Sequence, residues 1–113
     1  MHPHNDLFYH IILLSKHYIM LWYVSQSPID GVGLFASVNV FPMDVIGVAI
    51  DSNRVITPMA SKINHSWSPN CRLSFQNNQW FLYSFRPIPQ GNELTVDYRD
   101  TPDFILKPNP QWG

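Results

Sequence analysis

Ten prolines are distributed along this chain of 113 residues, and residues that favour helices are scarce. A proline inside an α-helix removes a backbone hydrogen bond and clashes with the preceding turn. The chain has one glutamate, Glu93, and only three alanines, although both residue types are good helix formers. Apolar residues make up 45% of the chain and aromatic residues 14%, and aromatic residues favour strands. The sequence therefore predicts a mostly β fold.

The length of the chain limits the number of domains, and its net charge limits the classes of partner that it can bind. A chain of 113 residues has room for one domain. Residues 1–17 differ from the rest because they contain four of the five histidines and a compact apolar run. We expect an N-terminal extension over residues 1–17 and one domain over residues 18–113. The net charge is −1, so no overall field attracts a polyanion, and we expect no direct binding to nucleic acid.

The single cysteine and the short apolar runs indicate a location inside the cell. Cys71 alone cannot form an internal disulfide or a zinc site built from several thiolates. The apolar runs at residues 8–14 and 18–24 are shorter than the roughly 20 residues that cross a bilayer. The start of the chain also lacks the cationic region of a signal peptide. We expect a reducing compartment, cytoplasmic or nuclear, and no membrane association. Residues 1–17 are a candidate segment for a homodimer, because residues 8–14 are apolar enough to need cover.

Hydrophobic patterning predicts short strands and two hairpins. The expected strands are residues 18–24, 34–40, 45–50, 71–75, 80–85 and 93–98. The second and third are expected to pair around a turn at residues 41–44, and the fourth and fifth around four polar residues at 76–79. The first, rich in aromatic residues, is expected to be buried. Residues 59–70 contain too many serines, asparagines and prolines for a regular element, and we expect a loop with one helical turn.

Two glycines at positions 31 and 33 mark the first candidate for chemistry. Gly31 and Gly33 flank Val32, and such spacing suggests a positive φ or the close approach of another group to the backbone. The segment is not a phosphate-binding loop, because neither a third glycine nor a helix follows. Cys71 alternates with polar neighbours in an expected strand, which favours a core position over a nucleophile.

Two further features combine polar groups with positions next to strands. Residues 63–70 place Asn64, His65 and Asn70 in a non-repetitive segment. A loop in which the asparagine side chains bind turn backbones explains that segment without any further function. Tyr98 ends an expected strand, on the face of Leu94. A half-buried tyrosine with a satisfied hydroxyl is the structural explanation for it.

Taken in order, three segments resemble the SET-domain lysine methyltransferases. They are Ser-Pro-Ile-Asp-Gly-Val-Gly-Leu-Phe-Ala at residues 27–36, Ile-Asn-His-Ser at residues 63–66 with Pro69 and Asn70, and Gly-Asn-Glu-Leu-Thr-Val-Asp-Tyr at residues 91–98. Each segment is weak alone, and the shared order makes the resemblance specific. The chain is similar to compact viral and bacterial-type members. The resemblance implies a β-clip fold of short curled sheets, with the C-terminal segment threaded under a loop as a pseudoknot.

The resemblance also implies a binding site for S-adenosylmethionine. The backbone around Gly31, Val32 and Gly33 would cradle the amino-acid end of this cofactor. Asn64 would hold its methionine part, and the backbone of His65 would meet the adenine. The imidazole of His65 is not implied as a base.

The implied reaction is methyl transfer to a lysine of a protein or peptide. Tyr98 is the implied catalytic residue, beside both the sulfonium and the incoming amine. Phe104 or Trp112 would cover the cofactor and form a wall of the lysine channel. No metal is implied, because the chain lacks the cysteine cluster of zinc-binding members.

Departures from the family pattern leave two other functions open. Few residues separate Ile50 from Ile63, where the family carries a longer insert that supplies much of the peptide groove. Asn92 replaces a common glutamate, and Trp67 stands where zinc-binding members often have cysteine. The alternatives are a degenerate SET domain that binds a partner or cofactor without catalysis, and a β module whose motifs serve as turns and caps. An acidic groove made by Asp97, Asp100 and Asp103 is a candidate contact for a basic partner.

Overall fold

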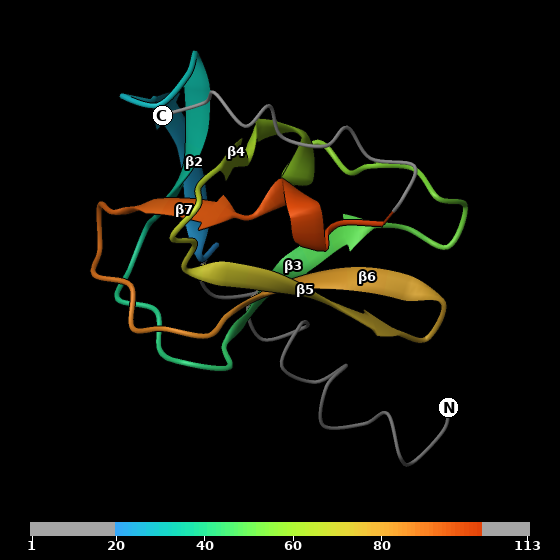
Figure 1. Cartoon of the computed structure of the whole chain (residues 1–113). Helices are drawn as coiled ribbons and strands as arrows, with labels where there is room; N and C mark the ends of the chain where they lie inside the picture. Colours follow the sequence, from blue (N-terminus) through green and yellow to red (C-terminus); the bar gives the residue numbers. More distant parts are fainter. Residues whose placement is uncertain (1–19, 103–113) are drawn as a thin grey trace.

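The computed structural model describes residues 20–102 as short strands with two turns of 3-10 helix (Figure 1). The strands are β1 (Trp22–Gln26), β2 (Val32–Ala36), β3 (Val45–Ile50), β4 (Asn64–His65), β5 (Cys71–Gln76), β6 (Gln79–Ser84) and β7 (Glu93–Val96). The helical turns are η2 (Ala60–Lys62) and η3 (Tyr98–Asp100). Among the described residues no helix is long and apolar enough to cross a membrane. The mostly β prediction and the single helical turn expected within residues 59–70 are confirmed.

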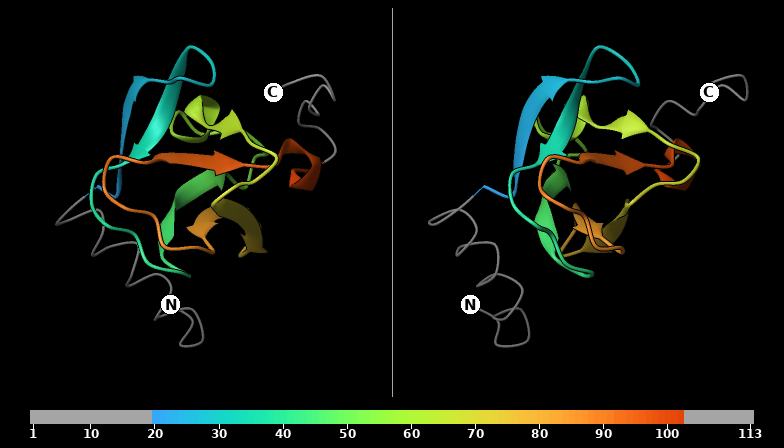
Figure 2. Two further views of the ribbon diagram at one scale, coloured as in Figure 1. Left: turned by 60° about the vertical axis from the view of Figure 1, so that its left-hand side comes forward. Right: turned by 90° about the vertical axis from the view of Figure 1, so that its left-hand side faces the viewer.

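The strands form two small sheets that enclose one core. One sheet has the order β1-β2-β7-β4 and the other the order β3-β6-β5. β7, drawn in orange in Figure 2, pairs with both β2 and β4. The fully buried apolar side chains come from both sheets and from the segments that join them: Leu34, Val40, Cys71, Leu82, Ile88 and Leu94. The short sheets thus share a single interior.

The hairpin of β5 and β6 agrees with the sequence prediction. Cys71 pairs with Ser84, and Gln76 pairs with Gln79 at the turn. Asn77 and Asn78 form the turn with φ values of 52° and 62°. Positive φ at both central positions matches the right-handed twist of the flanking strands, and asparagine tolerates it better than most residues.

The expected hairpin of residues 34–40 with residues 45–50 is wrong. β2 pairs with β1 and β7, whereas β3 pairs with β6 in the other sheet. The predicted turn at residues 41–44 does form, because the backbone N–H of Asp44 donates to the carbonyl of Phe41 at 3.0 Å. It carries the chain from one sheet to the other, and Val40 bridges to Ile88. Apolar runs encode burial, and they do not encode which strand becomes the partner.

Two further strand predictions need correction. β1 is an edge strand that begins at Trp22, and Tyr23 and Val24 are each 42% exposed, so the run is not buried as expected. The strand expected over residues 93–98 ends at Val96. There the carboxylate of Asp97 accepts a hydrogen bond from the backbone N–H of Arg99 at 2.9 Å and caps η3. A short polar side chain that binds nearby backbone competes with the strand ladder.

The parallel pair of β4 and β7 joins the middle of the chain to its C-terminal part. Asn64 pairs with Thr95, and His65 pairs with Val96. The backbone N–H of Ser66 extends the contact by donating to the carbonyl of Val96 at 2.9 Å. This is the juxtaposition expected for the C-terminal segment of a β-clip. The pair places the two later motifs beside each other.

Candidate functional site

The side chain of Asn64 links the middle motif to the glycine motif. Its Nδ2 lies 3.1 Å from the carbonyl oxygens of Asp30 and Val32, which are 34 and 32 residues away in the sequence. Gly31 lies between these carbonyls and has a φ of 45°, a conformation that glycine adopts without steric penalty. The turn that glycine permits therefore brings both carbonyls to Asn64.

The carboxylate of Glu93 lies between the same segments. It accepts hydrogen bonds from Ser27 Oγ at 2.8 and 2.9 Å and from Asn64 Nδ2 at 2.9 Å. A Cβ added to Gly33 would lie 2.3 Å from Glu93 Oε2. Gly33 does not have a positive φ, so the sequence requires glycine there because the carboxylate fills the space of a side chain.

Sequence reasoning did not place Ser27 or Glu93 in the candidate site. Two signals could have found them. Glu93 is the only glutamate of the chain, and it lies within the third motif. Ser27 opens the first motif. Neither signal showed that the two side chains meet.

Tyr98 is held at its backbone and at its hydroxyl. Its backbone N–H donates to His65 Nδ1 at 3.0 Å, and its Oη donates to the carbonyl of Ile63 at 2.7 Å. The rings of Tyr98 and His65 lie 5.2 Å apart between centroids. The structure thus brings the second and third motifs together. The tyrosine hydroxyl binds the carbonyl of Ile63, the residue that precedes Asn64 in the sequence.

Burial sets the protonation states of this pair. His65 is 6% exposed, and burial lowers its pKa, an effect that Asp97 partly opposes and Arg99 reinforces. Nδ1 accepts a hydrogen bond from Tyr98, which requires a neutral imidazole. Burial also raises the pKa of Tyr98, and the negative charge of Asp30 adds to the shift. Tyr98 therefore keeps its proton at neutral pH.

Asp97 does not contribute to an acidic groove. Its carboxylate is 5% exposed and accepts hydrogen bonds from Arg99 Nε at 3.1 and 3.0 Å. The hydrogen bond from this guanidinium is the largest of the effects that hold the pKa of Asp97 below its usual range. Arg99 lies 4.8 Å from the centroid of the Trp67 ring. The Trp67 and His65 rings are nearly perpendicular, with their centroids 4.2 Å apart. The acidic-groove prediction is wrong for Asp97, and Asp103 lies outside the described residues.

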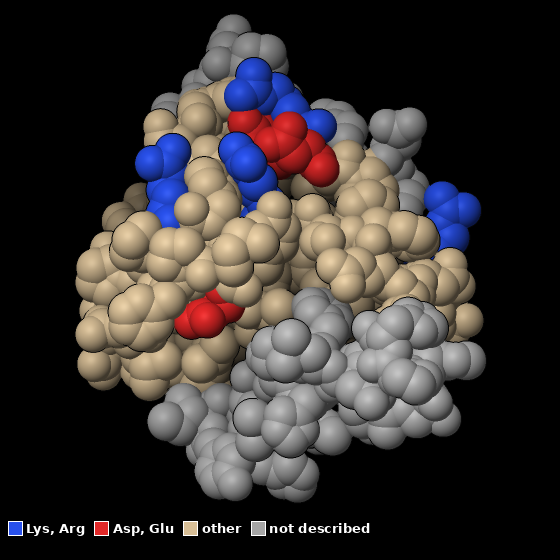
Figure 3. Space-filling model, turned by 90° about the horizontal axis from the view of Figure 1, so that it is seen from below, with Lys and Arg blue, Asp and Glu red and all other residues tan. Residues whose placement is uncertain are grey.

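Figure 3 shows basic and acidic side chains close together near its top, and single charged side chains elsewhere on a face that is otherwise mostly uncharged. The charged groups that the structure pairs most closely belong to the Asp97 and Arg99 cluster.

Within residues 20–102 no group of three His, Cys, Asp or Glu side chains could hold a metal ion. Cys71 is fully buried, and burial raises its pKa to about 12, so its thiol is a core group as predicted.

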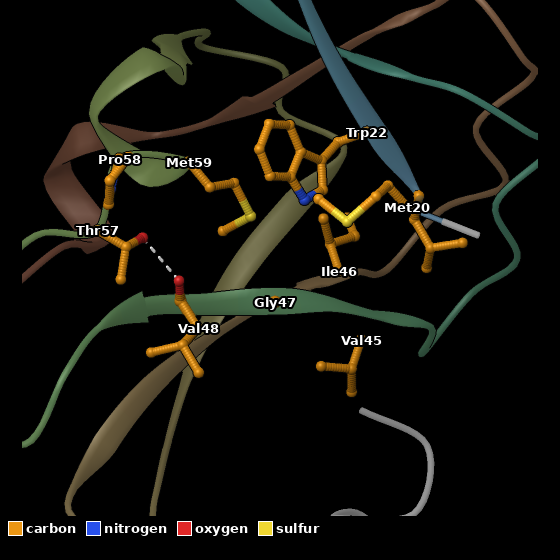
Figure 4. Close-up of a pocket in the computed structure, with 10 residues that line it drawn as sticks. Met20, Trp22, Val45, Ile46, Gly47, Val48, Thr57, Pro58 and Met59 are labelled. Carbon is orange, nitrogen blue, oxygen red and sulfur yellow. Dashed lines mark hydrogen bonds between the residues drawn. The ribbon is translucent and has the colours of Figure 1, made fainter. Parts of the chain in front are cut away.

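Three cavities of about 350 Å³ border β3 in the described part of the chain, and one of them reaches the motifs. Its walls are mainly apolar, and it is lined by Ala49, Ile50, Ile63, Leu73, Val96 and Tyr98 among others. A second cavity, shown in Figure 4, lies between Met20, Trp22 and Met59, where Thr57 Oγ1 donates to the carbonyl of Val48 at 2.7 Å. No residue of the three motifs lines that second cavity. Tyr98 lines the first cavity and does not line the second.

The structure therefore brings together Gly31, Val32, Gly33, Asn64, His65 and Tyr98. The predicted cofactor residue Trp112, the alternative Phe104 and the predicted dimer segment at residues 1–17 lie outside the described residues. A role of any of these in binding stays a prediction.

Comparisons with known proteins identify the family of the chain. The family model of the SET domain matches residues 10–99. The candidate SET domain-containing protein L222 of Acanthamoeba polyphaga mimivirus is 34% identical over 58 residues, which cover 43% of this chain and 18% of L222. Histone-lysine N-methyltransferase SMYD3 of Mus musculus is 42% identical over 43 residues, which cover 38% of this chain and 10% of SMYD3. This chain thus spans a small part of either relative.

A crystal structure of a candidate histone methyltransferase of Plasmodium falciparum shares the fold. The TM-score is 0.57 at 17% sequence identity, and the match covers 66% of this chain and 90% of that chain. The likeness supports the expected β-clip architecture of short sheets. Because the family model covers most of the chain and the three motifs meet in space, this chain belongs to the SET-domain family.

Proposed function

We propose that this chain transfers a methyl group from S-adenosylmethionine to a lysine of a protein or peptide. The observation that carries the proposal is the meeting of the three motifs, of which the second and third line an apolar cavity. Asn64 contacts the glycine loop, and the Tyr98 hydroxyl contacts the Ile63 carbonyl where both residues line that cavity. SMYD3, a relative, is by name a histone-lysine methyltransferase.

The residues around Asn64 fit the amino-acid end of the cofactor. That end carries an ammonium group, which needs hydrogen-bond acceptors. The carbonyls of Asp30 and Val32 and the side-chain oxygen of Asn64 are acceptors, and Gly31 and Val32 are exposed. We assign Gly31, Val32, Gly33 and Asn64 to this end of the cofactor, and the backbone of His65 to the adenine.

When bound, S-adenosylmethionine supplies a methyl group on a positively charged sulfur. The chain must then present a neutral lysine amine in line with that methyl group. The apolar cavity suits the aliphatic stem of a lysine. Burial in such surroundings disfavours the charged amine and lowers its pKa. The wall of this cavity at Tyr98 is therefore the place where a lysine would lose its proton before transfer.

Tyr98 would orient the amine without acting as a strong base. Its hydroxyl donates to the Ile63 carbonyl and retains oxygen lone pairs that can accept from an amine N–H. The carbonyl of Ile63 is a second acceptor at the same place. Burial keeps the phenol protonated, which favours a positioning role in which Tyr98 touches the substrate.

Calorimetric titration with S-adenosylmethionine and with S-adenosylhomocysteine tests the proposed cofactor. We expect saturable binding that Asn64→Ala weakens by about tenfold or more, since a hydrogen bond to a charged group contributes about 1.5–3 kcal/mol. The matched control is Asn53→Ala, which alters an exposed asparagine outside the three motifs. Absence of binding to the folded wild-type chain would exclude the proposal.

Transfer itself is measured with radiolabelled S-adenosylmethionine and an array of lysine peptides. We expect label on lysine with the wild-type chain and loss of label with Tyr98→Phe. Cofactor binding without transfer to any peptide or protein extract would favour the second candidate, a degenerate SET domain. The short segment between Ile50 and Ile63 is the feature that motivates this alternative.

A further inference from the structure

The side-chain amide of Asn64 is held in one orientation by oxygen atoms. Its Nδ2 lies 2.9 Å from Glu93 Oε2 and 3.1 Å from Ser27 Oγ and from the carbonyls of Asp30 and Val32. Ser27 Oγ donates its own proton to Glu93, so it accepts from Asn64. An amide oxygen in this place would face four oxygens without a proton between them. The amide nitrogen must therefore point into the cluster, and Oδ1 must point out of it.

Glu93 supplies the negative charge of this cluster. Its side chain is half-buried, and its hydrogen-bond partners Ser27 and Asn64 are neutral. In the described part of the chain, Asp97 forms an ion pair with Arg99 and lies 3.8 Å from the neutral imidazole of His65, and no ion pair includes Glu93. A carboxylate and two backbone carbonyls thus lie together, and no Lys or Arg of residues 20–102 forms an ion pair with them. Such a cluster favours a positively charged group beside it, because screening is weaker at a half-buried site than in water.

The space for this carboxylate depends on Gly33. A side chain there would overlap Glu93 Oε2 at 2.3 Å and approach the Cβ of Ser27 at 3.0 Å. The glycine motif and the glutamate of the third motif are therefore parts of one arrangement. Gly33 and Glu93 are packed against each other inside this arrangement. Gly31 and Val32, at its edge, are exposed to solvent.

We infer that Glu93 is a positioning residue for the ammonium group of the bound amino-acid end. It acts in two ways. Its hydrogen bond to Asn64 Nδ2 fixes the amide so that Oδ1 is presented as an acceptor, and its charge attracts the ammonium group. This inference rests on the proposed function, and it assigns Ser27 the role of holding the carboxylate in place.

The test compares two ligands that differ at the amino-acid end. S-adenosylhomocysteine carries the ammonium group, whereas methylthioadenosine carries the adenosine and sulfur without it. Glu93→Gln preserves the length of the side chain and removes its charge. We expect the dissociation constant of S-adenosylhomocysteine to rise about tenfold or more, and that of methylthioadenosine to stay within about twofold. NMR titration of the full chain measures weak and tight binding alike.

Two other variants separate charge from structure. Ser27→Ala removes a donor and keeps the charge of Glu93, so we expect a smaller loss of S-adenosylhomocysteine affinity than in Glu93→Gln. Asp51→Asn removes one negative charge from a turn outside the cluster while keeping an oxygen that can accept from Asn53 and Val55. We expect it to leave the affinity for both ligands unchanged.

Three results would overturn the inference. Equal losses for both ligands in Glu93→Gln would show that the residue only supports the fold. Unchanged affinity for both ligands would show that the cluster does not act on the ammonium group, and the proposed function would stand. A wild-type chain that binds neither ligand would instead reject the proposed function together with this inference.

Discussion

Protonation of His65 should destabilise this protein and release Tyr98. The imidazole is buried, and its Nδ1 accepts a hydrogen bond from the backbone N–H of Tyr98 at 3.0 Å. A proton on Nδ1 would replace this hydrogen bond with two opposed donors. Asp97 Oδ1 lies 3.8 Å from the same nitrogen, but Arg99 already neutralises that carboxylate. The site therefore favours the neutral imidazole.

The sign and size of the effect follow from proton linkage. The pKa of His65 is lowered from 6.5 in the folded chain, so below about pH 6.5 the unfolded chain binds more protons than the folded one. The contribution of His65 to stability is complete above this pH and is lost as the pH falls toward the folded-state pKa. One proton gives a slope of at most about 1.4 kcal/mol per pH unit. Asp97 titrates below this window, since its pKa is lowered from 3.8.

Urea unfolding of the wild type and of His65→Asn between about pH 8 and about pH 5 measures the effect. Asparagine keeps an oxygen that can accept from the Tyr98 N–H and does not titrate. We expect the wild type to lose stability below about pH 6.5 more steeply than the variant. Subtraction of the two profiles cancels the other histidines. Identical pH profiles would refute the assignment of a buried, neutral His65.

Five further substitutions test other contacts. Tyr98→Phe removes the hydroxyl that donates to Ile63, and we expect about 1 kcal/mol less stability in urea unfolding and about 10²-fold lower turnover, with cofactor affinity nearly unchanged; equal losses of turnover and affinity would count against its catalytic role. Gly33→Ala should displace Glu93 and lower the free energy of unfolding by about 1–3 kcal/mol in the same assay. In Gly31→Ala the new Cβ meets no atom within 4 Å, and the positive φ alone should cost about 1–2 kcal/mol. A Gly33→Ala variant as stable as the wild type would contradict the packing described. Leu34→Ala at a fully buried position should cost about 2–5 kcal/mol, and Val24→Ala on the exposed edge strand within about 0.5 kcal/mol; similar costs for the two would contradict the assigned core.

Local sequence signals predicted the parts of the fold that depend on neighbouring residues. The hairpin of β5 and β6 follows from alternation on both sides of Asn77 and Asn78, whose positive φ closes the turn. The core position of Cys71 follows from the same alternation. The positive φ of Gly31 was also expected from the paired glycines. Each of these depends on a few adjacent side chains.

The parts that depend on distant partners could not be predicted from periodicity. β2 and β3 are both apolar, and nothing in their sequences shows that they belong to different sheets. Asp97 was predicted to be available to a partner because the strand was expected to continue to residue 98. The strand ends at Val96 instead, and the turn that follows brings Arg99 onto the carboxylate of Asp97. The contact of Glu93 with Ser27 spans 66 residues. Only the resemblance to a family brought the three motifs into one expected site.

The most direct test of this account is an NMR titration of the amide-labelled chain with S-adenosylhomocysteine. We predict shifts at Gly31, Gly33, Asn64 and His65, and unchanged signals at Asn77 on the hairpin turn. This pattern would show that separate segments of the chain form one cofactor site. Shifts confined to the cavity at Met20 and Trp22, or no shifts at all, would contradict the central claim.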